Sequence, residues 1–190
     1  MNEATFGLVG NTIATGAGLY LDFANPLPEQ IITSDIARGL AKTCRFGGQI
    51  PGNGWYSVAE HCLLGARWIL ESTGNPDNAF GFLMHDAAEA YTGDIPKPLK
   101  VMLPDFAIVE QRLEAVIFAK YQLRHDIAFI KQCDMAMLKA EKLQLFPHNN
   151  DSWCGFDLVT AAPIHVHQLS PVIAAEAWFM LFSDLRDAIA

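Results

Sequence analysis

The sequence predicts a mainly α-helical fold with minor β-strands near the two ends of the chain. Apolar residues recur at helical spacing in several segments, and Ser, Asp or Pro stands where most of these segments begin. With 190 residues, the chain is long enough to bury one hydrophobic core but short for two. We therefore expect a single domain over residues 1–190, with a helical core at about 34–146 and additions on either side.

Composition and charge exclude several classes of protein. A formal net charge of −8 disfavours binding to DNA or RNA, because such binding depends on cationic side chains that release counterions. The four cysteines, at positions 44, 62, 133 and 154, show no Cys-x-x-Cys spacing typical of zinc knuckles or redox pairs. No apolar run approaches the length of a membrane span, and the N-terminus lacks the pattern of a secretion signal. We expect a soluble cytoplasmic protein.

The N-terminal half contains one predicted strand and two predicted helices before the richest motif. Gly18–Phe23 is expected to form a short strand. Thr33 or Ser34 is expected to cap a helix whose apolar spacing continues to Cys44. The next helix begins at Ser57–Glu60, which has the form of a capping box, and its widely distributed apolar residues predict a central position.

The segment after the central helix carries unusually many ionisable residues for a structural helix. A helix over Ala79–Tyr91, capped by Asp77, would place His85 and Glu89 on one face, with Asp86 on an adjoining row. Its apolar neighbours predict burial, and buried carboxylates are costly unless they are paired or bind metal. Gly93 suits the turn after the helix, so Asp94 would open the following loop beside the same pocket.

Two more helices follow this loop. The first is predicted to be capped by Asp105 and to expose Glu110 on its polar face. The second is predicted to run from Asp126 to about Phe146, with Ile127 in its apolar stripe. Asp134 lies among apolar residues of that helix, either as a metal ligand or as an acid beside the stripe, and Glu141 follows one heptad later.

The last segment is predicted to form a strand over Pro163–His167 and a helix that begins at Ser170. In this strand His165 and His167 would lie on the same face. Histidines on an exposed strand face are a more ordinary interpretation than a metal site. The helix has Trp178 and Phe182 on its packing side, and it could complete the core or supply a contact surface.

Together, the ionisable residues resemble the ligand pattern of the HD-domain phosphohydrolases: one histidine, then an adjacent His-Asp pair, then a distant Asp. His61 taken alone is more typical of a hydrogen-bonded core histidine. The longer segments Ser57–His61, Thr92–Pro96 and Arg45–Gly47 are similar to those of bacterial 5′-deoxynucleotidases and of phage relatives that include dATP triphosphohydrolases. The resemblance implies an HD-domain helical bundle.

The resemblance also implies roles for individual residues. It assigns one divalent metal ion, which could be Mn²⁺, Co²⁺, Zn²⁺, Fe²⁺, Ni²⁺ or Mg²⁺, to a mixed nitrogen and oxygen site. The implied metal ligands are His61, His85, Asp86 and Asp134; the catalytic residues are Glu89 and Asp94; the substrate-binding residues are Arg45, Phe46 and Lys97. Phe46 departs from the Trp of the 5′-deoxynucleotidases, and Lys97 could meet a longer phosphate chain or be a solvated loop residue.

The implied function is hydrolysis at the 5′-phosphate end of deoxynucleotides, first of all release of phosphate from deoxynucleoside monophosphates. The alternatives are a triphosphohydrolase acting on dATP, a hydrolase of a signalling nucleotide, and a non-catalytic nucleotide-sensing module. The expected partners are a small nucleotide and further copies of the chain, as a dimer or hexamer, with no nucleic-acid polymer and no membrane.

Overall fold

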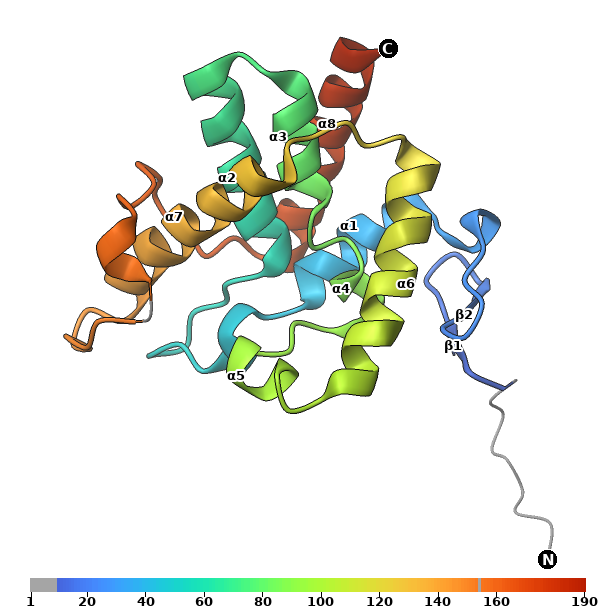
Figure 1. Ribbon diagram of the computed structural model, residues 1–190, viewed down its shortest axis with the longest axis horizontal. Coiled ribbons are helices and arrows are strands. Elements are labelled where there is room, and N and C mark those ends of the chain that lie inside the picture. Colours follow the sequence, from blue (N-terminus) through green and yellow to red (C-terminus); the bar gives the residue numbers. More distant parts are fainter. Residues whose placement is uncertain (1–9, 154) are drawn as a thin grey trace, which may run out of the picture.

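The computed structural model describes residues 10–153 and 155–190 and confirms a mainly helical protein (Figure 1). The helices are α1 (Thr33–Lys42), α2 (Val58–Thr73), α3 (Pro76–Met84), α4 (Glu89–Thr92), α5 (Lys97–Lys100), α6 (Pro104–Tyr121), α7 (Ile127–Leu145) and α8 (Pro171–Ile189). Short 3₁₀ turns occupy Pro28–Gln30, Arg45–Gly48 and Phe156–Leu158. None of the helices in the described ranges is long and apolar enough to cross a bilayer.

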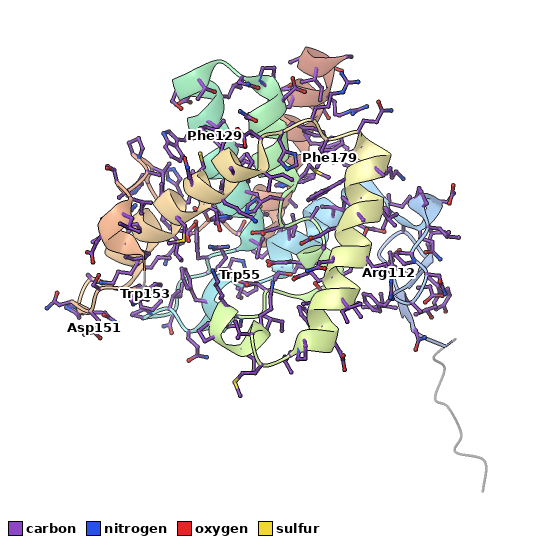
Figure 2. The ribbon with its side chains drawn as sticks, viewed as in Figure 1. Trp55, Arg112, Phe129, Asp151, Trp153 and Phe179 are labelled. Carbon is purple, nitrogen blue, oxygen red and sulfur yellow. The ribbon has the colours of Figure 1, made fainter. Side chains whose placement is uncertain are left out.

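The strands form one small hairpin at the N-terminal end. β1 (Thr12–Ala14) pairs antiparallel with β2 (Tyr20–Asp22), with Ile13 opposite Leu21. Leu21 is fully buried, which anchors the hairpin to the helices. Arg112 of α6 donates from Nη1 to the carbonyl oxygen of Phe23 at 3.2 Å and lies beside the hairpin (Figure 2). The predicted strand at Gly18–Phe23 is confirmed in its central residues.

The central position of α2 is confirmed, because it packs against α1, α3, α7 and α8. Gly65 permits the close approach of α3: a Cβ added there would lie 2.1 Å from a ring carbon of Phe82. From the far end of the sequence, α8 completes this core (Figure 1). The Trp178 side chain is fully buried and donates from Nε1 to the carbonyl oxygen of Leu83 at 3.3 Å.

Helix starts were predicted with mixed success. Ser57 and Ser170 accept hydrogen bonds from the first free backbone amides of α2 and α8, as expected. Asp126, predicted only as the start of its helix, caps α7 in the same way. The predicted caps Asp77 and Asp105 are wrong, since each follows a proline that is the first residue of its helix. Proline has no amide to satisfy and its fixed φ starts the helix one residue earlier.

The helix predicted to begin at Thr33 or Ser34 has no side-chain cap. Ile32 occupies the cap position of α1, and the Thr33 hydroxyl is hydrogen-bonded to the Tyr121 hydroxyl at 2.8 Å instead. The helix also ends earlier than predicted, at Lys42. Cys44 lies beyond it and forms an isolated antiparallel bridge with Ser57.

The single helix predicted over Ala79–Tyr91 is wrong. The helix stops at Met84, and α4 begins only at Glu89. Between them the amides of Ala87 and Glu89 donate to the carbonyls three residues earlier, at 3.0 and 2.9 Å. This tighter turn has fewer residues per turn than an α-helix. The i, i+4 argument for one shared face therefore does not hold across this segment.

Three further predictions are corrected. Residues 163–167 form no strand; instead the Gln144 side chain bonds the Ile164 carbonyl and the Val166 amide, both at 3.0 Å. Ile127 is 62% exposed, because the first turn of α7 projects into solvent. Glu110 is buried rather than on a polar face, since α5 folds back on α6 and brings Lys100 against it at 2.8 Å.

Candidate metal centre

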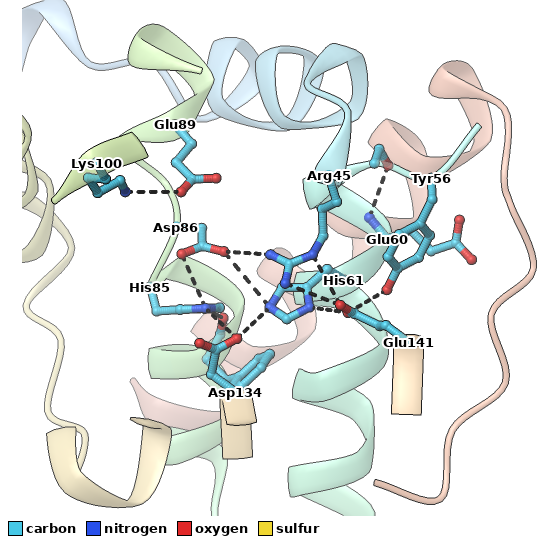
Figure 3. A network of polar contacts seen from close by, with 12 residues as sticks. Arg45, Tyr56, Glu60, His61, His85, Asp86, Glu89, Lys100, Asp134 and Glu141 are labelled. Carbon is cyan, nitrogen blue, oxygen red and sulfur yellow. Dashed lines mark hydrogen bonds and ion pairs between the residues drawn. The ribbon is translucent and has the colours of Figure 1, made fainter. Parts of the chain in front are cut away.

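Four residues from three parts of the chain meet beside α2 (Figure 3). His61 comes from α2, His85 and Asp86 from the turn after α3, and Asp134 from α7. Oδ1 of Asp134 lies 3.3 Å from His61 Nε2 and 3.9 Å from His85 Nε2. The Asp86 carboxylate lies 3.8 Å from His61 Nε2 and 3.2 Å from His85 Nε2. The fold thus brings together the four residues that the sequence assigned to a metal.

The two imidazole rings are held by their other nitrogens. Nδ1 of His85 donates to the carbonyl oxygen of Phe82 at 2.6 Å, and Nδ1 of His61 lies 2.5 Å from Oε1 of Glu141. Because a carbonyl or a carboxylate can only accept, both Nδ1 atoms carry the proton. Both Nε2 atoms are buried without a hydrogen-bond partner. Such Nδ1 bonds are how proteins orient metal-ligating histidines.

The donor set fits a divalent metal ion. One ligand atom each from His61, His85 and Asp86 lie within 4.8 Å of one another, and Asp134 adds a second carboxylate. Although burial and Arg45 lower the pKa of His61, Glu141 and Asp134 outweigh them and raise it to about 9. A metal ion at Nε2 would therefore displace a proton, as metal binding to histidine generally does. The Asp134 side chain is 40% exposed, which opens the cluster to solvent.

Glu141 is a fully buried carboxylate behind this cluster. Its Oε1 accepts the Tyr56 hydroxyl at 2.7 Å, and its Oε2 accepts Nε and Nη2 of Arg45 at 3.2 and 3.1 Å. Burial raises the pKa of Glu141, but Arg45 and His61 outweigh this and hold it at about 2. Glu141 is therefore charged, and its spacing of one heptad from Asp134 was the only sequence signal for this position.

The two predicted catalytic acids lie on either side of a sharp turn. Glu89 is buried at the start of α4, and Asp94 is half-buried after Gly93, whose φ of 81° confirms the need for glycine. Burial, followed by the charges of Asp86 and Asp94, raises the pKa of Glu89 to about 10. Burial also raises the pKa of Asp94, and Arg45 opposes this shift. The pKa values of both acids are thus affected by Asp86 and Arg45.

The three predicted substrate-binding residues differ in placement. Arg45 faces the cluster, with Nη1 3.6 Å from Oδ2 of Asp86. Phe46 turns toward an aromatic group: its ring lies 5.3 Å from that of Phe146 and 6.0 Å from that of Trp153, which Figure 2 shows on the segment after α7. Lys97 is exposed, and no ion pair is recorded for it among the described residues.

The lysine that faces the acids is Lys100. Its Nζ lies 3.8 Å from Oε1 of Glu89 and 2.8 Å from Oε1 of Glu110. Both lysines stand in the short segment after Asp94, so sequence alone could not choose between them. Lys97 begins α5 and points to solvent, whereas Lys100, one turn later, faces α6.

The Glu60 carboxylate binds a segment that the capping-box pattern did not predict. Ser57 accepts from the Glu60 amide as predicted, but the Glu60 side chain does not return to Ser57. Its carboxylate accepts the amides of His167, Gln168 and Leu169 at 2.7, 3.0 and 2.7 Å. It therefore ties the segment before α8 to the residue next to His61.

Comparison with known proteins gives the chain its relatives. No protein-family model matches it. It is 34% identical over 175 residues to the uncharacterized protein YfdR of Escherichia coli (strain K12), covering 91% of this chain and 93% of that protein. The chain belongs to the YfdR family. Another relative is the uncharacterized protein RCAP_rcc00048 of Rhodobacter capsulatus, 34% identical over 120 residues and 56% of each chain.

Proposed function

We propose that this YfdR-family protein is an HD-domain, metal-dependent phosphohydrolase that acts at the 5′-phosphate end of deoxynucleotides, with deoxynucleoside monophosphates as its first substrates. One observation carries the proposal. Two buried imidazole Nε2 atoms lack hydrogen-bond partners and face two carboxylates, while both Nδ1 atoms are engaged elsewhere. Buried polar atoms without partners are costly, so this arrangement favours a bound cation.

His61, His85, Asp86 and Asp134 would hold the metal ion. A divalent ion there supplies an acidified water and positive charge for the phosphoryl oxygens. Arg45 would bind an anionic oxygen of the substrate, because its Nη1 end faces the cluster. Glu89 would carry the proton transfer, since its environment favours the protonated form and it lies beside Lys100. Asp94 would orient the water or the substrate.

The aromatic group beside Arg45 supports a nucleoside as the rest of the substrate. The guanidinium carbon of Arg45 lies 5.5 Å from the centre of the Phe46 ring, which in turn contacts Phe146. Aromatic rings beside a guanidinium suit a flat base.

The test is a product analysis with purified, metal-stripped protein. Deoxy- and ribonucleoside mono- and triphosphates are each incubated with Mn²⁺, Co²⁺, Mg²⁺ or no metal, and the products are separated by chromatography. Orthophosphate from deoxynucleoside monophosphates supports the proposal. Intact triphosphate and deoxynucleoside from dATP would replace it with the triphosphohydrolase alternative. No turnover with any substrate would contradict both and favour a signalling nucleotide or a sensor.

A further inference from the structure

We infer that Glu141 is a positioning residue that fixes two parts of the site with one carboxylate: the metal ligand His61 and the cationic side chain of Arg45. The inference rests on the proposed function, since it assumes a metal at His61 and an anion at Arg45. It concerns how strongly each is bound and whether the two binding events depend on each other.

Oε1 of Glu141 is the atom that fixes the ring of His61. This atom contacts Nδ1 of His61 at 2.5 Å and accepts the Tyr56 hydroxyl at 2.7 Å. Glu141 and His61 are fully buried, and Tyr56 is 1% exposed. With no water to replace these bonds, the imidazole plane is fixed and Nε2 stays directed at Asp86 and Asp134.

Oε2 of Glu141 fixes Arg45. It accepts hydrogen bonds from Nε and Nη2 of that side chain. These bonds occupy one edge of the guanidinium and leave Nη1 beside Asp86, at 3.6 Å. An anionic oxygen bound at the metal would therefore lie next to the free end of Arg45. The planar guanidinium is suited to such divided contacts, because its donors point in fixed directions.

The shared carboxylate has a consequence for Asp86. Without the charge of Glu141, the nearest recorded carboxylate for Arg45, whose side chain is only 11% exposed, would be Asp86. Arg45 would then compete with the metal ion for one of its ligands, because an unpaired buried cation is strongly unfavourable. Removing Arg45 as well should remove that competition.

The experiment measures Mn²⁺ binding to metal-stripped protein and inorganic phosphate binding to Mn²⁺-loaded protein by calorimetry. Glu141→Gln keeps an acceptor for His61 but loses the charge, and we expect Mn²⁺ affinity to fall about 10- to 100-fold. Phosphate affinity should fall by about 10-fold or more, since Arg45 loses its anchor. Adding Arg45→Met to Glu141→Gln should restore part of the Mn²⁺ affinity, but not the phosphate affinity.

Two further variants keep the result interpretable. Tyr56→Phe removes one of the contacts to Glu141 without leaving a charge unpaired, and it should lower Mn²⁺ affinity measurably, by about two- to fivefold. Asp35→Asn alters a buried acid of α1 that bonds the Ala17 amide, and it should leave both affinities unchanged. If Glu141→Gln fails to fold, Tyr56→Phe still tests whether Oε1 of Glu141 positions His61. Unchanged Mn²⁺ affinity in that variant would overturn this role.

The inference and the proposed function fail in different ways. Wild-type affinities in Glu141→Gln, or no recovery of Mn²⁺ affinity in the double variant, would overturn the positioning role while leaving hydrolysis intact. Binding changes as predicted, in a protein that hydrolyses no nucleotide, would support the positioning role and contradict the proposed function.

Discussion

Glu89 has a pKa that is strongly changed by its surroundings. It is buried next to two other acids and its pKa is raised to about 10, yet Lys100 lies 3.8 Å away and favours the charged form. Such opposed influences are typical of a group that exchanges a proton during a reaction. Its place on α4, directly after the turn with the ligands, keeps it near them without making it a ligand.

Glu89→Gln should therefore separate catalysis from metal binding. We expect kcat to fall on the order of 10²- to 10⁴-fold, because the amide cannot transfer the proton. Mn²⁺ affinity should stay within a few-fold of wild type. Calorimetry and phosphate release on the same sample measure both, with the exposed acid variant Glu71→Gln as control. Turnover at the wild-type rate would rule out the proton-transfer role.

The two lysines after Asp94 provide a matched pair. Lys100→Ala should raise KM or lower kcat by about 10-fold or more, because it removes a charge beside Glu89 and leaves buried Glu110 unpaired. Lys97→Ala should change neither by more than about twofold, since its side chain is exposed. Steady-state kinetics on both variants compare them, and the reverse order of effects would be inconsistent with the structure.

At the residue scale, the four residues predicted as metal ligands do lie together, but the side chains that surround them were not predicted. His61, His85, Asp86 and Asp134 stand out because ionisable residues in apolar surroundings need a partner. By sequence, Glu141 is an ordinary helix residue and Lys100 belongs to a proline-rich segment expected to be extended, which instead forms α5. Only the packing of α7 on α2 and of α5 on α6 gives them partners. Long-range pairing of this kind has no local signature.

At the element scale, the approach of α4 to α1 determines where Glu89 lies. Gly39 of α1 makes this approach possible: a Cβ added there would lie 2.6 Å from the carbonyl oxygen of Ala90 and 2.7 Å from its Cβ. Ala90 is adjacent to Glu89, so any displacement of α4 would also move the proposed proton-transfer group. The contact involves backbone, which cannot rotate away as a side chain can.

Gly39→Ala tests this contact. Alanine favours a helix over glycine by about 1 kcal/mol, but overpacking costs roughly 1–3 kcal/mol, so we expect net destabilisation. Activity should fall more than metal affinity, because α4 carries Glu89 and none of the ligands. Urea unfolding and kinetics measure the two effects. A gain in stability would mean that α1 and α4 separate without cost.

The first residue of a helix could be predicted from a capping side chain only where no nearby proline started the helix earlier. Ser57 and Ser170 cap helices as their sequence context predicts. Pro76 and Pro104 start helices ahead of the expected acidic caps. The break at His85 could not be predicted from periodicity, since an α-helix and this tighter turn share the same apolar residues. The segment at 163–167 alternates like a strand but has no strand to pair with.

At the scale of the whole molecule, the chain has a formal net charge of −8, and several of its acids lie near the proposed site. Glu114 of α6 belongs to this region: burial, followed by the charges of Glu110 and Asp86, raises its pKa from 4.5 to about 7. The folded protein therefore binds this proton more tightly than the unfolded chain does. Stability is lost as pH rises between about 4.5 and 7, because the charged form is disfavoured in the folded state.

Glu114→Gln should remove this loss. In metal-stripped protein, the variant should gain stability relative to wild type between about pH 5 and about pH 8. The gain is expected to be roughly 1 kcal/mol or less, since Glu114 is partly exposed and solvent screens its charge. Urea unfolding at the two pH values measures the difference. A variant that instead loses stability relative to wild type as pH rises would reverse the sign we derive.

The helical class followed from periodicity, but the contribution of the C-terminal helix did not. Trp178 is fully buried between α8 and α3, so the last helix completes the core, while Phe179 remains 42% exposed. The predicted packing side, with Trp178 and Phe182, is confirmed, but the pattern did not show whether this helix completes the core or supplies a contact surface. Homo-oligomerisation stays a prediction, which light scattering of the purified protein would measure.

The central claim is that one divalent metal at His61, His85, Asp86 and Asp134 is required for nucleotide hydrolysis. Bound Mn²⁺ and phosphate release from deoxynucleoside monophosphates should be measured on the same samples of wild type and Asp134→Ala. We predict one ion per wild-type chain, no activity after metal removal, recovery with Mn²⁺, and loss of both properties in the variant. Phosphate release by protein that no longer binds metal would contradict the account.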